Sequence, residues 1–252
     1  MFVILLFNVV LFLIYFYIGY KSNNQWWLNG IYFILFILAL ANVSYYAHLF
    51  DNSSLYFEYR TQFWADLTPS LSGFLVGSSI KIPNIIYRIS FGALLIFMAI
   101  FGIFGPWAKP ILFPMNYDSL QNRWRGDICM QSTGTCGPCS LANILYANGI
   151  ESSENELARE AYTTSSGTES WYLARCARRR GFQTKFIHDI NHLEKNSIIG
   201  ISLGKAGHFV SILDIKDNVI YVADSITGIQ KVNKDKFHDL FKFKGMSLVL
   251  SK

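Results

Sequence analysis

The sequence predicts a chain of two parts, with membrane-spanning helices first and an α+β domain second. Residues 1–115 hold most of the apolar residues and almost no acidic ones, whereas residues 116–252 carry mixed charge and glycine turns. In the second part, helical periodicity comes first and strand alternation follows, which is the α+β order. We therefore expect a transmembrane domain over 1–115 and a globular domain over 116–252.

Three apolar runs in the first part have the length of a membrane span. They cover residues 1–20, 27–49 and 86–108, and about 20 such residues cross a hydrocarbon core. Residues 64–80 are apolar but shorter and contain Asp66 and Pro69, so a fourth span stays open. No basic region precedes the first run, which favours a retained segment over a cleaved signal peptide.

The flanking charges of these runs bear on orientation. With three spans, Arg60 and Lys81 lie on the side opposite the C-terminal domain, and the larger number of flanking bases tilts that domain toward the cytoplasm. Asn8 falls inside the first run, where an amide most often makes a hydrogen bond between helices. We expect a multi-pass membrane protein with its second domain on the cytoplasmic face.

The second part divides into helices and then strands. The predicted helices cover 136–148, 153–162 and 169–180, and the predicted strands cover 182–187, 198–203, 208–215, 219–223 and 247–250. The turn sequence Lys216-Asp217-Asn218 joins the third and fourth strands, which predicts an antiparallel hairpin.

Three side chains in this part suggest nucleophilic catalysis. Cys136 opens the first helix, and a thiol at a helix N-terminus beside an imidazole loses its proton readily. His208 begins one strand of the predicted hairpin and Asp224 ends the other, so the carboxylate can hold the imidazole in one tautomer. We predict Cys136 as nucleophile, His208 as general base and Asp224 as the group that orients it, with Asp214 and Asp217 as alternatives to Asp224.

Gln131 lies just upstream of the predicted nucleophile. Its side-chain amide and the backbone N–H of Cys136 could together bind the oxyanion of a tetrahedral intermediate, which typically contributes about 3 kcal/mol. The predicted reaction is attack of a thiolate on an amide carbonyl, formation of an acyl-enzyme and hydrolysis.

These blocks resemble a known family. The sequences QSTGTCGPCSLANIL at 131–145, GHFVSI at 207–212 and DSITG at 224–228 are similar to the bacteriocin-processing peptidases that cut double-glycine leaders. The resemblance implies a papain-like fold, a peptide substrate cut after a glycine pair, and a separate exporter as partner. This sequence has one residue fewer between Gln131 and Cys136 than that family usually has, and Ser225 stands where a proline often follows the aspartate.

Two alternatives remain open at this level. Cys136 and Cys139 have the C-x-x-C spacing of thiol-disulfide oxidoreductases, although no later proline follows Pro138. A non-catalytic module that docks a leader peptide for an exporter is the other alternative. We expect Cys139 to face the core.

Composition excludes some other classes of protein. The net charge of +5 comes from scattered bases, which argues against a nucleic-acid partner. The four cysteines match no repeated zinc pattern and no dense disulfide framework, and they suggest a reducing compartment. We expect no cofactor and no metal.

Overall fold

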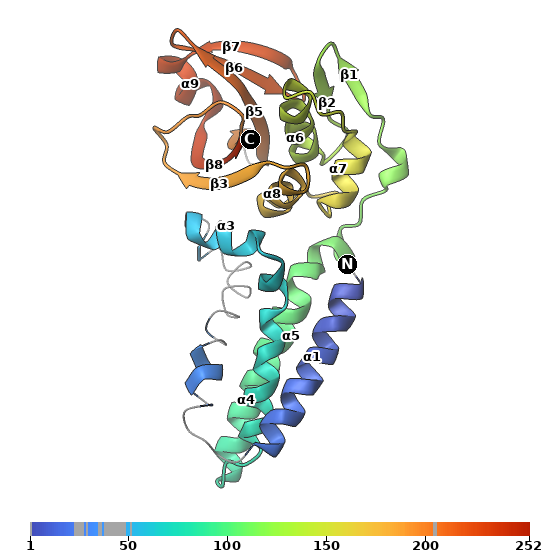
Figure 1. Cartoon of the computed structure of the whole chain (residues 1–252), viewed down its shortest axis with the longest axis vertical. Helices are drawn as coiled ribbons and strands as arrows, with labels where there is room; N and C mark the ends of the chain where they lie inside the picture. The colour runs from blue at the N-terminus through green and yellow to red at the C-terminus, as the bar shows by residue number, and fades with distance from the viewer. Residues whose placement is uncertain are drawn as a thin grey trace. The chain divides into compact units, whose positions relative to one another are not determined.

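The computed structural model describes residues 2–22, 28, 30–34, 37, 49–50, 52–203 and 206–252 (Figure 1). The chain packs as two compact units. The helical unit consists of Met1–Asp51 and Gln62–Ile111, and the sheet unit consists of Asn52–Thr61 and Leu112–Lys252. The predicted domain boundary after residue 115 lies close to Ile111, but the sheet unit also includes ten residues from the first part of the chain.

The helical unit contains two long apolar helices among its described residues. They are α1 (Phe2–Lys21) and α5 (Ile85–Leu112), and both are long and apolar enough to cross a membrane. The predicted run at 27–49 lies mostly outside the described residues. The stretch that left a fourth span open is divided into η1 (Phe63–Asp66), η2 (Thr68–Leu71) and α4 (Ser72–Ser79).

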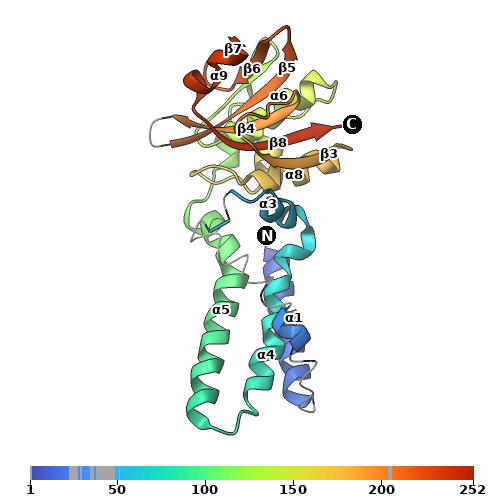
Figure 2. The ribbon, with the colours of Figure 1, turned by 90° about the vertical axis from the view of Figure 1, so that its left-hand side faces the viewer.

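Helices α1 and α4 run side by side at very short distance (Figure 2). A Cβ added to Gly73 would lie 2.3 Å from the carbonyl oxygen of Phe12, and one added to Gly77 would lie 2.1 Å from that of Phe16. Small residues four apart allow this kind of backbone contact in membrane helices. Asn8 donates to the backbone carbonyl of Asp66 at 2.9 Å, so it makes the predicted hydrogen bond between segments.

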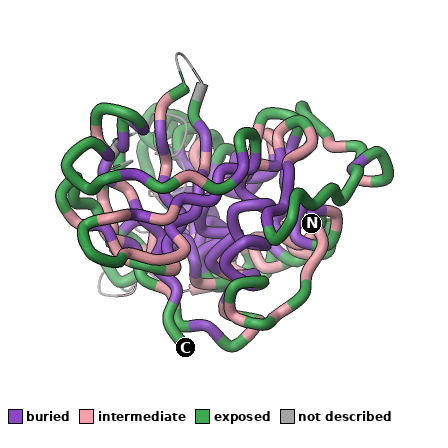
Figure 3. The backbone as a smooth tube through the Cα atoms, turned by 90° about the horizontal axis from the view of Figure 1, so that it is seen from above, coloured by how far each residue is buried: buried purple, intermediate pink, exposed green. Residues whose placement is uncertain are grey.

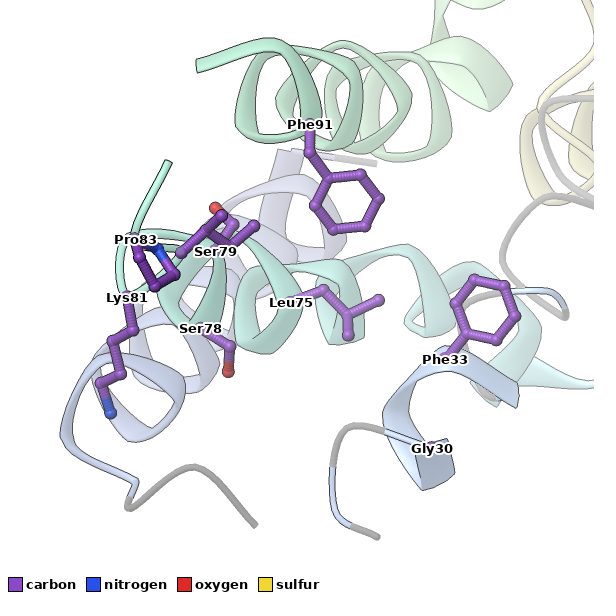
Figure 4. A pocket seen from close by; sticks show the side chains of 9 residues that line it. Gly30, Phe33, Leu75, Ser78, Ser79, Lys81, Pro83 and Phe91 are labelled. Carbon is purple, nitrogen blue, oxygen red and sulfur yellow. The ribbon is translucent and has the colours of Figure 1, made fainter. Parts of the chain in front are cut away.

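A cavity of ≈ 440 Å³ lies in the helical unit and is shown in Figure 4. Leu75 and Phe91 contribute to its lining, and Lys81, also in the lining, donates to the backbone carbonyl of Ser22. The lining also includes Phe33 and Gly30, and Gly30 adjoins a residue outside the described part of the chain.

The sheet unit is built on a two-stranded and a six-stranded antiparallel sheet. The first pairs β1 (Arg123–Arg125) with β2 (Ile128–Met130). The second has the order β3-β8-β4-β5-β6-β7. Its strands are β3 (Gln183–His188), β4 (Ser197–Leu203), β5 (Ala206–Lys216), β6 (Val219–Asp224), β7 (Gly228–Asn233) and β8 (Phe243–Ser251).

Helices cover this sheet and enclose its core. The unit contains η3 (Tyr117–Ser119), α6 (Cys136–Ala147), α7 (Glu154–Glu160), α8 (Ser170–Arg179) and α9 (Lys234–Phe241). Ser211 on β5 donates to a backbone carbonyl of α6, whereas its neighbours Val210 and Ile212 join an apolar cluster with Phe237 of α9. Alternation along β5 therefore connects the sheet with both helices, and the buried chain gathers in the interior (Figure 3).

Helix α3 (Ser54–Thr61) belongs to the sheet unit and protects its edge. The carboxylate of Glu58 accepts from the backbone N–H of Phe186 at 2.7 Å and from Arg178 at 3.0 Å. Because β3 is an edge strand, this contact occupies a donor that would otherwise be open to another chain. Arg60 lies over the ring of Trp171 at 4.8 Å, so the three-span arrangement that put Arg60 on the opposite side is wrong.

The predicted α+β order is confirmed, with differences in detail. All three predicted helices and all five predicted strands are present, and the predicted hairpin is β5–β6. The sequence analysis missed α3, β1, β2, β7 and α9. Ser153 caps α7 by accepting from the backbone N–H of Glu156, and the side chain of Glu156 binds Arg180.

Candidate active site

The thiol of Cys136 lies at the first residue of α6. Helix α6 begins there, after Thr135, and the first N–H groups of a helix have no partner inside it. Cys136 is partly exposed, whereas the residues that follow it in the helix are buried through Leu145. The helix therefore presents one thiol and open backbone donors at its N-terminal end.

The hairpin of β5 and β6 holds His208 and Asp224 against each other. His208 is near the start of β5 and Asp224 is the last residue of β6. The Nε2 atom of His208 lies 2.9 Å from Oδ1 of Asp224, and both side chains are buried. Asp224 also accepts from the backbone N–H of Ile226 and from the hydroxyl of Thr227, each at 2.9 Å. These bonds fix the carboxylate, which in turn fixes the ring.

The ionisation of His208 reflects both of its neighbours. Burial lowers the pKa of His208, but hydrogen bonds to Asp224 and to the thiol of Cys136 outweigh burial and raise this pKa from 6.5 to about 9. Because Nε2 faces Asp224, Nδ1 is the ring nitrogen available to Cys136. Burial raises the pKa of Asp224, but its bonds to His208 and the Ile226 N–H outweigh this and lower it. At neutral pH the site therefore holds an imidazolium beside a carboxylate.

Gln131 is fixed by Ser225 through two hydrogen bonds. The backbone N–H of Gln131 donates to the carbonyl of Ser225 at 3.0 Å, and the hydroxyl of Ser225 donates to Oε1 of Gln131 at 2.8 Å. Since the amide oxygen is engaged, the NH₂ group remains as the donor. Ser225 directly follows Asp224, so one turn holds both the carboxylate and the glutamine.

Glu154 is a functional candidate that the sequence analysis missed. It is fully buried and accepts four hydrogen bonds: from the backbone N–H groups of Asn122 and Ser132 and from the hydroxyls of Ser132 and Thr135. All four donors are neutral, and three of them lie in the loop between Gln131 and Cys136. An acid in the first turn of a helix is common at the surface, so no signal in the sequence marked its burial.

The four cysteines fall into three environments. Cys129 of β2 and Cys139 of α6 form a disulfide, Cys136 is free, and Cys176 is free and buried. Cys139 is fully buried, as predicted. Its bond to Cys129 contradicts the oxidoreductase alternative, which needs Cys139 to pair with Cys136. The disulfide also disagrees with the reducing compartment that the cysteine pattern suggested, because disulfides are rare in such compartments.

The two alternative carboxylates do not orient His208. Asp214 forms an ion pair with Lys216, and Asp217 lies in the β5–β6 turn with φ +47°. The structure thus brings Cys136, His208 and Asp224 into one chain of contacts and leaves Asp214 and Asp217 outside it.

A thiol at a helix start beside an imidazole that a carboxylate holds is the arrangement of papain-like cysteine peptidases. The Peptidase C39 family matches residues 128–252, and two curated relatives are 34% and 32% identical to the chain over 116 residues. The chain belongs to the peptidase C39 family. It is therefore a cysteine-type peptidase with a papain-like fold.

Two curated relatives come from archaea. An uncharacterised protein of Methanothermobacter marburgensis is 34% identical over 116 residues, which are 45% of this chain and 82% of the relative. A second one, from Methanothermobacter thermautotrophicus, is 32% identical over 116 residues, with the same coverage.

Solved peptidase domains are also similar. The peptidase domain of Streptococcus ComA, described as a bifunctional ABC transporter involved in quorum sensing, has 21% identity and a TM-score of 0.43, over 52% of this chain and 96% of that chain. A double glycine motif protease from an AMS/PCAT transporter, solved with its leader peptide, has 23% identity and a TM-score of 0.42, over 49% and 89%.

Proposed function

We propose that this protein is a membrane-bound peptidase that removes the leader of a peptide substrate by cutting after a pair of glycines. Cys136 is the nucleophile, His208 the acid and base, Asp224 the orienting group, and Gln131 a donor to the oxyanion. The observation that carries this proposal is the buried pair of His208 and Asp224, with Nε2 2.9 Å from Oδ1, and the nearby Cys136 thiol, which helps to raise the pKa of His208. The glycine pair follows from the resemblance of the three sequence blocks to leader peptidases.

The reaction begins from the pair in which His208 already holds the thiol proton, that is, a Cys136 thiolate beside the His208 imidazolium. The Cys136 thiolate attacks the scissile carbonyl, and the oxyanion accepts hydrogen bonds from the Cys136 N–H and the Gln131 NH₂ group. The imidazolium of His208 then protonates the leaving amine, and the C–N bond breaks to leave a thioester. His208 next takes a proton from water, the hydroxide attacks the thioester, and the thiol is released with the carboxylate product.

The membrane arrangement is also a proposal. Thr61 and Leu112 both belong to the sheet unit, so a bilayer segment between them must cross twice or re-enter. We take α5 as one of these crossings and residues 63–79 as the other. Together with α1 and the predicted run at 27–49, they make four spans. The flanking bases favour the cytoplasmic face for the sheet unit, and this is the side that we propose. The Cys129–Cys139 disulfide is an observation against it, because disulfides persist mainly in oxidising compartments.

Cleavage and thiol labelling test the proposed chemistry. Full-length protein in detergent is incubated with synthetic leader peptides that contain Gly-Gly or, as matched substrates, Val-Val. Cys136→Ala should abolish cleavage of the Gly-Gly peptide. A thiol-reactive inhibitor should label Cys136, since burial raises the pKa of the other free thiol, Cys176, to about 12.

Two outcomes would contradict this function. Normal labelling of Cys136 without cleavage of any leader peptide would leave docking as the better explanation. Equal cleavage of the Gly-Gly and Val-Val peptides would refute only the proposed specificity for a glycine pair and would leave the peptidase function standing. Sidedness follows from labelling cysteines introduced at Lys81 and at Lys236 in intact cells, because the four-span arrangement puts these two positions on opposite sides.

A further inference from the structure

A cavity of ≈ 560 Å³ opens between the β1–β2 hairpin and the β6–β7 turn. Gln131 and Ser225 line one part of it, and Arg123, Trp124 and Arg125 of β1 line another. The cavity therefore adjoins the glutamine that we propose as oxyanion donor. A peptide substrate extends beyond its scissile bond, and its flanking residues can reach this cavity.

The two arginines of the cavity are available for a ligand. Both are exposed, and neither has an ion pair or a side-chain hydrogen bond within the described part of the chain. Other arginines of the sheet unit differ: Arg159 pairs with Asp118, and Arg180 pairs with Glu156 and Glu160. The charges of Arg123 and Arg125 are therefore not paired with an acidic group in the described part of the chain, and a bound ligand can pair with them.

The register of β1 and β2 places these charges close to the reacting groups. Arg123 lies opposite Met130, the residue before Gln131, and Arg125 lies opposite Ile128. Side chains two apart on a strand point to the same side, so both guanidinium groups extend from one side of the hairpin. Residues opposite each other on paired strands have Cβ atoms about 5 Å apart.

The walls of the cavity add apolar surface to this charge. Ile226, which follows Ser225, and Trp124 are both exposed and line the cavity. Trp124 lies between the two arginines on β1, so its ring points to the other side of the hairpin, where it packs against Tyr146 at 5.2 Å. A guanidinium pair beside the exposed apolar side chain of Ile226 suits a carboxylate side chain with an apolar neighbour.

We propose that this cavity binds an acidic segment of the peptide substrate, next to the scissile bond. Arg123 and Arg125 bind one or two carboxylates of that segment, and Ile226 contacts an adjacent apolar side chain. This inference rests on the proposed peptidase function and adds a substrate class to it, namely peptides with Asp or Glu near the cleavage site. Residues 123–127 precede the part of the chain that matches the peptidase family, so the family match does not imply this specificity.

A charge-swap experiment tests the proposal with full-length protein in detergent. Gly-Gly leader peptides carry a pair of Glu, Gln or Lys residues at successive positions on either side of the cut. At the matching position, the Glu peptide should exceed the Lys peptide by about fivefold or more in kcat/KM, the size expected for partly exposed ion pairs. Salt at about 0.5 M should reduce this preference.

Two variants complete the test. Arg123→Glu with Arg125→Glu should invert the preference, so that the Lys peptide becomes the better substrate, while labelling of Cys136 stays unchanged. Lys234→Glu with Lys236→Glu makes the same change in charge on the exposed surface of α9 and should leave the preference intact. Cleavage without any charge preference, or a preference that the arginine variant retains, would overturn the proposal, whereas no cleavage of any peptide would refute the peptidase function instead.

Discussion

The two halves of the active site are held in place by different means. The His208–Asp224 half is one β-hairpin, whose strands pair directly and whose turn supplies the remaining bonds to the carboxylate. The Cys136 half is a loop and a helix start that depend on distant groups: Glu154 for the loop and Ser225 for Gln131. Local contacts set the base, whereas contacts far apart in the sequence set the nucleophile and the oxyanion donor.

Replacing His208 should have the largest effect, because it removes the group that transfers protons in the reaction, whereas the other substitutions remove groups that only hold such residues in place. His208→Ala takes away the group that accepts the thiol proton and protonates the leaving amine. We expect kcat to fall by about 10³-fold or more, with no change in the rest of the hairpin. Steady-state cleavage of a Gly-Gly peptide measures this, and thermal unfolding shows that the fold persists.

Glu154→Gln should lower the activity by disturbing the loop that precedes Cys136. Both oxygens of Glu154 accept from two donors each, so an NH₂ group at either place would face hydrogen-bond donors and leave them without partners. We expect a loss of about 10²-fold in kcat with a small change in KM. Glu156→Gln, on the same helix but half exposed and bound to Arg180, is the matched control and should keep its activity.

The result for Glu154 separates support from general stability. If the variant unfolds at a lower temperature but retains kcat when folded, Glu154 is a stabilising group only. If Cys136 labels more slowly in the folded variant, the loop has moved and the positioning role holds.

The pH profile should report the protonation of His208, to which Asp224 and Cys136 both contribute. The folded-state pKa of His208, about 9, lies above the unfolded value near 6.5. The stability that comes from the charged ring is therefore fully present below about pH 6.5 and is lost as the pH rises through about 9. We expect the rate to fall by about tenfold per pH unit above that point, since the acid for the leaving amine is then deprotonated. His208→Asn should remove the stability change in unfolding experiments between these pH values.

The same contrast explains what the sequence could predict. The hairpin was accessible because the turn Lys216-Asp217-Asn218 and the alternation beside it are local signals. The partners of Glu154 lie 19, 22 and 32 residues upstream, and no pattern joins them. Likewise, four cysteines allow several pairings, and only the fold brings Cys129 to Cys139.

Missed elements have a similar cause. Strand β7 reads GIQKVN, which alternates too weakly to stand out among polar residues, and it forms because β6 provides the pairing edge. Helix α9 is only eight residues long, and buried Phe237 and Phe241 hold it to the sheet. In both elements tertiary packing, rather than local propensity, decides the structure.

Ser225→Ala should have the smallest effect and gives the sharpest test of the distant contacts. The hydroxyl of Ser225 holds Oε1 of Gln131, and without it the amide can rotate away from the oxyanion. We expect kcat to fall by about tenfold, within the contribution of one oxyanion donor. A double-mutant cycle with Gln131→Ala measures the coupling: once the amide is gone, Ser225→Ala should change kcat no further. An equal loss in both backgrounds would mean that Ser225 acts through Asp224, its neighbour on the hairpin, and not through Gln131.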